Sequence, residues 1–302
     1  MNVALVDIDS HNFPNLVLMK LSAWHKAKGD TVMLVSPEDI IQQNLFSTDY
    51  DKVYGACVFD WNKVKAEELE RLGVEVAGSG TGKPDTLPDE IEHIYPDYSL
   101  YGISDTAYGF LTRGCPRQCP FCIVAGKEGA RSRKVADLSE WWDGQKNIKL
   151  LDPNLLACPE SRSLLCQLID SGAWVDFTQG LDARLLQSGT IDLLMQVKAK
   201  RVHFAWDNPN DNLCKASLKR FAERVMKHKA DYVKYKVYIL TNYWSTLEQD
   251  LYRIYWLRDN GYDPYVMIYD KANAPKEIRR LQRWVNNKII FRSCDKFEEY
   301  MA

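Results

Sequence analysis

Residues 107–122 read AYGFLTRGCPRQCPFC, an apolar, strand-like stretch that leads directly into a loop with three cysteines. Cys115, Cys119 and Cys122 follow one another at spacings of four and three residues. Thiolates at such spacings can hold three corners of an iron-sulfur cube and leave the fourth iron open for another ligand. The motif therefore indicates a [4Fe-4S] cluster with one open iron.

Other roles for these cysteines are less well supported. Zinc would need a fourth protein ligand, usually from a second Cys or Cys/His pair, whereas the remaining cysteines stand far apart in the sequence. Disulfides are typical of secreted proteins, but residues 1–7, MNVALVD, resemble a strand rather than a secretion signal. The sequence thus favours a reducing compartment.

The composition is that of a globular protein with room for two domains. The chain has 302 residues, of which 46% are hydrophobic and 26% are charged, and this balance excludes general disorder. A net charge of -2 does not indicate a nucleic-acid partner. No apolar run approaches the ~20 residues that span a bilayer. We expect a cytoplasmic protein without a membrane partner.

Residues 1–80 alternate between strand-like and helical stretches, and this predicts a small parallel α/β domain. The stretches are strands at 2–7, 31–35, 53–58 and 74–77, and helices at 15–28 and near 62–72. Residues 81–100 are rich in Gly, Pro and acidic residues, and we predict that they form a linker with a boundary near residue 100.

Residues 101–302 continue the alternation through six units. Strands are predicted at 107–112, 148–151, 174–178, 201–205, 234–240 and 264–269, and helices around 137–145, 160–171, 183–198, 212–229 and 246–260. Six units exceed a minimal doubly wound sheet and suit an incomplete barrel. Chemistry in such barrels takes place at the carboxyl ends of the strands, and the cysteine loop directly follows the first strand.

The segment LTRGCPRQCPFC, residues 111–122, resembles the signature of the radical S-adenosylmethionine (radical SAM) superfamily. Residues 123–141, IVAGKEGARSRKVADLSEW, are similar to the stretch after the cluster in methylthiotransferases and cobalamin-binding radical SAM enzymes. The resemblance extends to about residue 270. It implies a flavodoxin-like, cobalamin-binding-like domain over residues 1–80, then a partial (β/α)6 TIM-type barrel with a C-terminal helical extension over residues 101–302.

The same resemblance implies an activity. In the superfamily, SAM binds the open iron of the [4Fe-4S] cluster, and an electron passed through the cluster cleaves SAM to give a 5'-deoxyadenosyl radical. The implied function is a radical SAM enzyme that acts on an unidentified substrate, with an electron donor such as flavodoxin or ferredoxin. The alternatives are a cobalamin-dependent radical SAM methyltransferase and a non-enzymatic iron-sulfur electron carrier or sensor.

The resemblance also implies SAM contacts after the first two strands of the barrel. Phe121 matches an aromatic residue whose surroundings meet the adenine ring in the family. Asp152 and Asn154 lie where the family receives the SAM amino group, although this chain has LLDPNLL in place of a Gly-Gly-Glu segment. Simple packing by Phe121 and a turn built from Asp-Pro-Asn are the alternatives.

Further SAM contacts are implied after the third and fourth strands. Arg184, in FTQGLDARLL, matches a basic residue that faces the SAM carboxylate, and Gln179 lies at the strand end. Asp207, in HFAWDNP, matches an acid that accepts hydrogen bonds from ribose hydroxyl groups. The alternative for Arg184 is a solvated side chain in a helix that Asp182 caps.

A possible cobalamin ligand lies near the N-terminus. Asp9-Ser-His11-Asn-Phe-Pro14 nearly matches the Asp-x-His-x-x-Gly motif that places a histidine on cobalt. Proline replaces the glycine, and ACVFDW replaces the expected Ser-x-Leu segment after the third strand. A turn that leads into the first helix is the alternative, with His11 as an ordinary loop residue.

Two basic runs complete the set of candidate features. Arg131, Arg133 and Lys134 follow the cysteine loop, and residues 276–292 read KEIRRLQRWVNNKIIFR. Both runs suit contact with a phosphate-bearing or RNA substrate. A solvated helix face is the commoner explanation of such runs.

Overall fold

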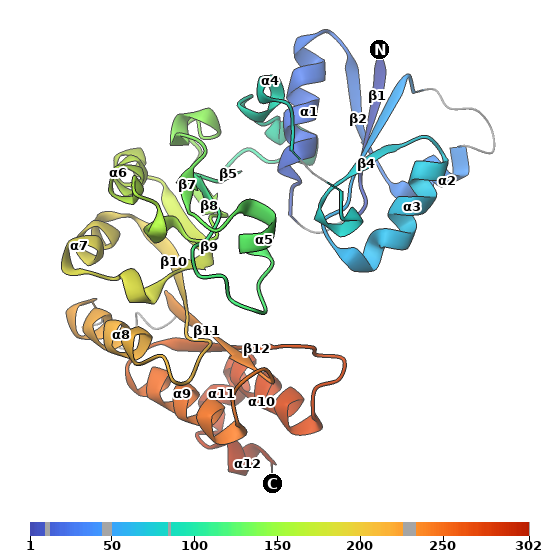
Figure 1. Ribbon diagram of the computed structural model, residues 1–302. Coiled ribbons are helices and arrows are strands. Elements are labelled where there is room, and N and C mark those ends of the chain that lie inside the picture. The colour runs from blue at the N-terminus through green and yellow to red at the C-terminus, as the bar shows by residue number, and fades with distance from the viewer. Residues whose placement is uncertain (10–12, 44–49, 84–85, 226–233, 302) are drawn as a thin grey trace. The chain divides into compact units, whose positions relative to one another are not determined.

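The computed structural model describes residues 1–9, 13–43, 50–83, 86–225 and 234–301. They form two compact units, each built of α/β structure with a parallel sheet (Figure 1). One unit comprises Met1–Tyr108 with Ser139–Gln145, and the other comprises Gly109–Leu138 with Lys146–Ala302. The boundary that we expected near residue 100 therefore lies at Tyr108.

The N-terminal unit contains a four-stranded sheet in the order β2-β1-β3-β4, whose strands pair in parallel. Its strands are β1 Asn2–Asp7, β2 Thr31–Val35, β3 Lys52–Ala56 and β4 Glu75–Ala77. Its longer helices are α1 Leu16–Ala27, α2 Pro37–Gln43 and α3 Lys63–Arg71. The Asn15 side chain begins α1, because its oxygen accepts hydrogen bonds from the amides of Val17 and Leu18.

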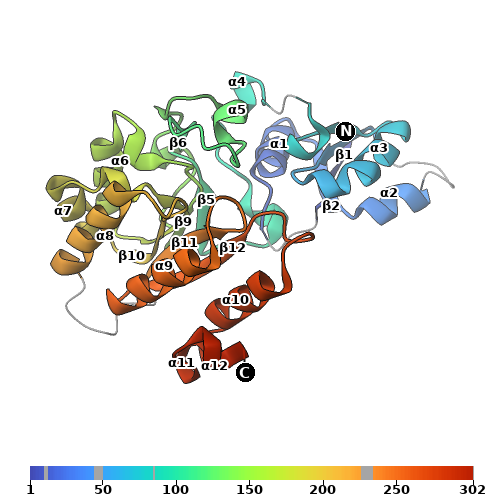
Figure 2. The same ribbon diagram turned by 60° about the horizontal axis from the view of Figure 1, so that its bottom comes forward.

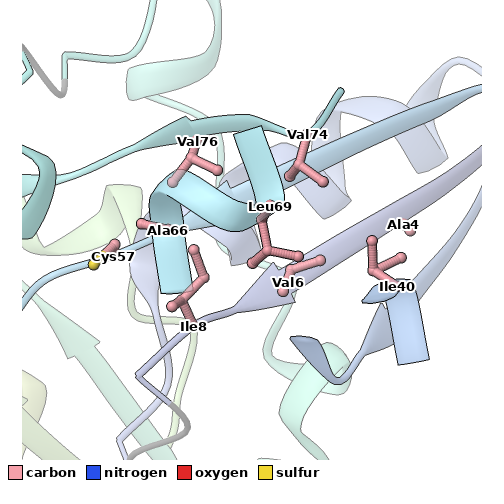
Figure 3. Close-up of a cluster of buried hydrophobic side chains, with 9 residues drawn as sticks. All are labelled: Ala4, Val6, Ile8, Ile40, Cys57, Ala66, Leu69, Val74 and Val76. Atoms are coloured by element: carbon pink, nitrogen blue, oxygen red, sulfur yellow. The ribbon is translucent and has the colours of Figure 1, made fainter. Parts of the chain in front are cut away.

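Helices cover both faces of this sheet. Ile40 from α2 and Leu69 from α3 pack with Ala4 and Val6 of β1 on one face, as Figure 3 shows. Leu18 of α1 packs on the opposite face. Alternate residues of one buried strand thus point into two separate apolar cores, which explains why β1 is apolar without interruption.

η2 Ser79–Thr81 precedes the segment that we expected to be a linker, and the segment itself contains α4 Asp89–Glu92 and most of η3 Tyr98–Tyr101. It packs onto the N-terminal unit, because Ile91 is buried in the same cluster as Val3 and Leu18. The helix predicted at 137–145 is wrong. That stretch forms only a short turn, η4 Leu138–Glu140, and Gly144 adopts a positive φ of 81° that a helix does not allow.

The C-terminal unit is built on a six-stranded sheet in the order β5-β8-β9-β10-β11-β12. Its strands are β5 Thr106–Gly109, β8 Asn147–Leu150, β9 Trp174–Leu181, β10 Ala199–Ala205, β11 Tyr235–Thr241 and β12 Asp263–Ile268. The helices between them are α6 Ser161–Ser171, α7 Ser188–Gln196, α8 Asn212–Val225 and α9 Leu247–Asp259. The β8-β9, β9-β10, β10-β11 and β11-β12 pairs are all parallel, so their carboxyl ends meet at one edge.

Two of the predicted elements of this unit are interrupted. The strand expected at 107–112 ends at Gly109, and Thr112–Arg113 form a separate strand, β6, antiparallel to β7 Arg133–Lys134. The helix expected at 183–198 divides into η6 Ala183–Leu185 and α7. Both interruptions lie at the carboxyl edge of the sheet.

The outer edge of β12, the last strand of the sheet, is covered by side chains rather than by another strand. Asn286, at the end of α10 Lys276–Asn286, accepts a hydrogen bond from the Val266 amide at 2.8 Å and donates one to the Val266 carbonyl at 2.9 Å. Lys288, which begins α11 Lys288–Ser293, donates to the Pro264 carbonyl at 2.8 Å. The exposed edge of β12 is thereby covered, and the chain ends with α12 Phe297–Met301. In the part of the chain that is described, no helix is both long and apolar enough to cross a membrane.

We predict that Asn286→Ala lowers the free energy of unfolding by about 1–3 kcal/mol, because the Val266 amide loses its side-chain partner and the Val266 carbonyl keeps only the hydrogen bond from Gln282 at 3.2 Å. Urea denaturation measures the change. Asn210→Ala removes the same atoms from an exposed position, and its effect should stay within about 0.5 kcal/mol. Equal losses in the two variants would show that Asn286 does not hold the strand edge.

Candidate functional site

All three cysteines of the motif lie on the loop between β6 and α5 Val124–Glu128, at the carboxyl edge of the sheet. Cys115 and Cys119 are partly buried and Cys122 is exposed. The Cys115 amide donates to the Gly129 carbonyl at 3.1 Å, and the Cys122 amide donates to the Cys119 carbonyl at 2.9 Å. Among the described residues, no three His, Cys, Asp or Glu side chains are gathered as a ready metal-binding group.

Two local features give this loop its path. Gly114 has a φ of 85°, and a Cβ atom there would lie 2.2 Å from the Arg131 carbonyl oxygen, so the position requires glycine. Glu128 bridges the base of the loop, since it accepts hydrogen bonds from the Arg113 guanidinium at 2.8 Å and the Gly114 amide at 3.1 Å. The sequence analysis did not identify Glu128, because one glutamate in a polar stretch carries no signal of its partner.

Asp152 ties the start of the loop to the end of β8. Its side chain is 4% exposed and accepts hydrogen bonds from the Leu111 amide at 2.9 Å and from the Thr112 amide and hydroxyl at 2.6 and 2.5 Å. Burial raises the pKa of Asp152 to about 7, although these hydrogen bonds and the charge of Arg113 oppose the shift. The carboxylate implied as a SAM contact therefore has both oxygens engaged by the protein.

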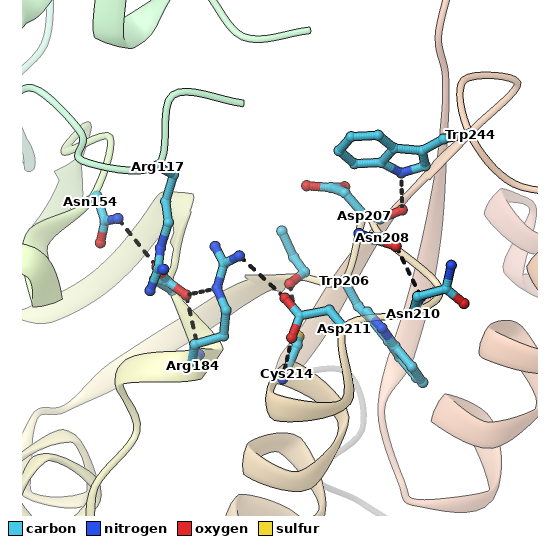
Figure 4. Close-up of polar contacts among 12 residues, drawn as sticks. Arg117, Asn154, Arg184, Trp206, Asp207, Asn208, Asn210, Asp211, Cys214 and Trp244 are labelled. Atoms are coloured by element: carbon cyan, nitrogen blue, oxygen red, sulfur yellow. Dashed lines mark hydrogen bonds and ion pairs between the residues drawn. The ribbon is translucent and has the colours of Figure 1, made fainter. Parts of the chain in front are cut away.

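Asn154 lies beside the first cysteine and is 3% exposed. Its amide nitrogen donates to the Cys115 sulfur at 3.4 Å. The same nitrogen lies 3.5 Å from an Asp182 oxygen (Figure 4). Its side-chain oxygen is buried, and no partner for it occurs among the described residues. An acceptor without a donor is costly inside a protein, so this atom is a candidate for contact with a ligand.

Two arginines share one carboxylate next to this asparagine. Asp182 accepts hydrogen bonds from the Nε atoms of Arg117, on the cysteine loop, and Arg184, at 2.5 and 2.7 Å. Arg184 also pairs with Asp211 at 3.2 Å, as Figure 4 shows. Burial alone would raise the pKa of Asp182, but the hydrogen bonds and charges of Arg184 and Arg117 outweigh it and keep the pKa below its usual value.

These contacts settle the local structure around Arg184. Asp182 caps η6 by accepting from the Arg184 amide, as the alternative interpretation held, but Arg184 is not a solvated side chain. Its two ion pairs hold it at the strand ends together with Arg117, which the sequence analysis did not single out. Gln179 lies exposed in an irregular part of β9, where the register with β10 shifts.

Asp207 follows β10 at the same edge of the sheet. Burial raises the pKa of Asp207 to about 6, against the opposing charges of Arg253 and Arg184. Its backbone carbonyl accepts hydrogen bonds from the Trp244 indole at 3.0 Å and from Arg253 at 2.7 Å. These contacts fix the residue through its backbone.

A fully buried arginine organises the neighbouring strand ends. Arg253 of α9 donates to the Trp206 and Asp207 carbonyls at the end of β10, and to the Leu240 carbonyl of β11 at 3.0 Å. Asp250, one helical turn away and equally buried, pairs with it at 2.5 Å. In the sequence this pair resembles an ordinary surface pair at i and i+3, so its burial could not be foreseen.

Four aromatic side chains gather beside the cysteine loop. The Phe121 ring meets the Tyr243 and Trp244 rings edge to face at 5.5 and 5.6 Å, and Tyr243 meets Tyr269 at 4.7 Å. Tyr243 and Tyr269 follow β11 and β12, so three separate loops contribute to the group. We call Phe121, Tyr243, Trp244 and Tyr269 the aromatic mouth.

The loops of the aromatic mouth contain strained backbone. Gln118, Asn242 and Asp270 are the non-glycine residues with positive φ among those described, at 49°, 60° and 48°. Each lies within three residues of a ring of the mouth. Such conformations persist only where the surroundings enforce them, and they concentrate at functional sites.

The possible cobalamin ligand, His11, lies outside the described residues. Asp9, its neighbour in the motif, accepts hydrogen bonds from the Val58 amide at 2.5 Å and from the Asn62 side chain at 2.8 Å. This carboxylate therefore holds the turn after β3. Close packing requires glycine at position 78 in the turn after β4, since a Cβ atom there would lie 2.2 Å from the Cys57 carbonyl oxygen.

Comparison with known proteins adds no further assignment. No protein-family model matches the chain, and no curated protein sequence is significantly similar to it. The functional interpretation consequently depends on the cysteine loop and on the side chains around it.

We predict that Asp152 makes folding pH-dependent. Because burial raises the pKa of Asp152 to about 7, from about 4 in unfolded chains, the folded state binds more protons between these values. The contribution of Asp152 to the free energy of unfolding should therefore be complete below about pH 4 and be lost as the pH rises to about 7. Its size is roughly 1.4 kcal/mol per unit of difference between the two pKa values. Urea denaturation at several pH values, compared between the native chain and Asp152→Asn, isolates this contribution.

Asp170→Asn provides the matched control, because Asp170 is exposed on α6. Its pH profile should follow that of the native chain. Parallel profiles for all three proteins would mean that Asp152 ionises in the folded protein as it does in the unfolded chain.

Proposed function

We propose that this chain is a radical SAM enzyme that acts on an unidentified substrate. The observation that carries the proposal is the placement of Cys115, Cys119 and Cys122 on one loop at the carboxyl edge of a six-stranded parallel sheet. We further propose that this sheet is a partial (β/α)6 TIM-type barrel. The 2-1-3-4 strand order of the N-terminal unit supports a flavodoxin-like fold there, related to cobalamin-binding domains.

The residues around the loop fit a [4Fe-4S] cluster together with SAM. Three thiols from one loop supply three soft ligands for iron. The unpartnered Asn154 oxygen is an acceptor for an ammonium group, and the paired guanidinium groups of Arg117 and Arg184 suit a carboxylate. When bound, the cluster supplies the electron that cleaves SAM to methionine and a 5'-deoxyadenosyl radical.

The side chains around the cluster would then orient SAM. Asp182 keeps the guanidinium groups of Arg117 and Arg184 in fixed positions, so little conformational entropy is lost when a carboxylate binds. Asp207 lies where the family binds the ribose, and its elevated pKa allows the carboxyl group to donate or accept a hydrogen bond near neutral pH. Phe121, held among Tyr243 and Trp244, offers a ring edge for adenine.

We predict that the anaerobically reconstituted protein produces 5'-deoxyadenosine from SAM when reduced by dithionite, or by a donor such as flavodoxin or ferredoxin. Cys119→Ala should abolish this product, because two thiolates from the loop cannot hold the cluster. Chromatography of the nucleoside product and iron and sulfide analysis measure the result.

Cys166→Ala is the matched control, because Cys166 is exposed on α6 and lies outside the loop. It should retain both the cluster and the product. The proposal fails if the native protein binds zinc alone, or if it binds a cluster held by four protein thiolates and does not cleave SAM.

We predict that Asn154→Ala raises the Kd of SAM by roughly tenfold, the effect of losing one hydrogen bond to a charged group. The iron and sulfide content should not change, since Asn154 is not a thiolate ligand. Equilibrium dialysis of the reconstituted protein with labelled SAM measures the Kd. Gln196→Ala, at the exposed end of α7, should bind SAM like the native protein, and an equal Kd in both variants would exclude Asn154 as a SAM contact.

A further inference from the structure

The aromatic mouth is partly open to solvent. Trp244 and Tyr269 are 40% and 43% exposed, although each is fixed by a neighbour. The Trp244 indole donates to the Asp207 carbonyl, and the Tyr269 ring packs edge to face against the Tyr243 ring at 4.7 Å. Large rings that are exposed but held in position offer a flat surface to a planar group, because no ordering cost arises on binding.

A stripe of positive charge runs along α10. Lys276, Arg279 and Arg283 are exposed at positions i, i+3 and i+7, so they share one face of the helix over about 10 Å. Among the described residues, none of the three forms an ion pair within the distance limits of a salt bridge. Ile278, Leu281 and neighbouring apolar residues occupy the buried face. We call Lys276, Arg279 and Arg283 the basic stripe.

The basic stripe leads to the aromatic mouth. Asn286, the last residue of α10, contacts Val266 in the middle of β12, and Lys288, at the start of α11, contacts Pro264 nearer the start of the strand. The chain here runs antiparallel to β12, and α10 lies before this point in the chain. The first residue of α10, Lys276, consequently lies toward the carboxyl end of β12. Tyr269 of the mouth follows directly at that end.

We propose that the C-terminal unit binds a single-stranded nucleic acid, with phosphates along the basic stripe and a base stacked on Trp244 or Tyr269. A row of cations beside exposed aromatic rings is the arrangement by which proteins hold single strands. An acidic peptide would satisfy the cations but would not use the rings. The net charge of -2 does not oppose this inference, because phosphate contacts depend on charges within about a Debye length. The proposal goes beyond the proposed function, since binding needs neither SAM nor reductant.

Fluorescence anisotropy of the reconstituted protein with a short labelled oligouridylate tests the proposal. The triple variant Lys276→Glu, Arg279→Glu, Arg283→Glu should bind the oligouridylate at least tenfold more weakly. In a plot of the logarithm of the association constant against the logarithm of the salt concentration, the magnitude of the slope should fall by about two. The control variant Arg162→Glu, Lys200→Glu, Arg220→Glu reverses three exposed cations elsewhere in the same unit. The net charge changes by the same amount in both triple variants. The control should keep most of the affinity, because its three residues lie outside the basic stripe.

Trp244→Ala separates stacking from charge. It should weaken binding about fivefold or more while leaving the salt dependence unchanged. Equal losses in both triple variants, or competition by polyglutamate as effective as by unlabelled oligouridylate, would overturn the proposal. A failure of SAM cleavage would leave these binding results intact, so the two proposals can fail separately.

Discussion

Asp152 joins the start of the cysteine loop to the end of β8 through three hydrogen bonds from Leu111 and Thr112, and the position at which the loop leaves the sheet depends on this contact. Hydrogen bonds to a charged group contribute about 1.5–3 kcal/mol each, which offsets much of the cost of burying a carboxylate. β5 ends at Gly109, and the amides of Leu111 and Thr112 donate to Asp152. The strand is shorter than its apolar sequence suggests, and the cysteines begin from a rigid base.

The other carboxylates of the site have opposite electrostatic environments. Two guanidinium groups keep the pKa of Asp182 low, so Asp182 stays ionised and fixes both arginines. Asp207 is buried with weaker compensation, and its pKa rises to about 6. Pairs of acids whose surroundings separate their pKa values commonly serve different roles in one site. Asp182 therefore suits a permanent structural charge, whereas Asp207 suits a hydrogen-bonding partner whose protonation responds to the ligand.

The sequence pattern located most strands but not the side chains that hold their ends. β1 was predicted at residues 2–7 and lies there, because a short apolar run that a turn follows favours a buried strand. The helix at 137–145 was wrong, since periodicity does not register the positive φ of Gly144. Asp152 was predicted as a SAM contact. Its hydrogen-bond partners in the protein could not be predicted, because they lie about 40 residues away and leave no local pattern. Arg253 was missed for the same reason.

Helix α10, which covers the edge of β12, also determines which side chains lie beside the aromatic mouth. A complete barrel would place another strand beside β12, whereas here Asn286 and Lys288 satisfy its polar groups. One face of α10 must be apolar to pack against the sheet, and the other face is free to carry charge without cost to the core. The closure of the strand edge thus leaves a cationic helix beside the aromatic mouth, where a further strand would have presented neutral backbone. A long, charged substrate can follow such a border, while a small one would contact only the mouth.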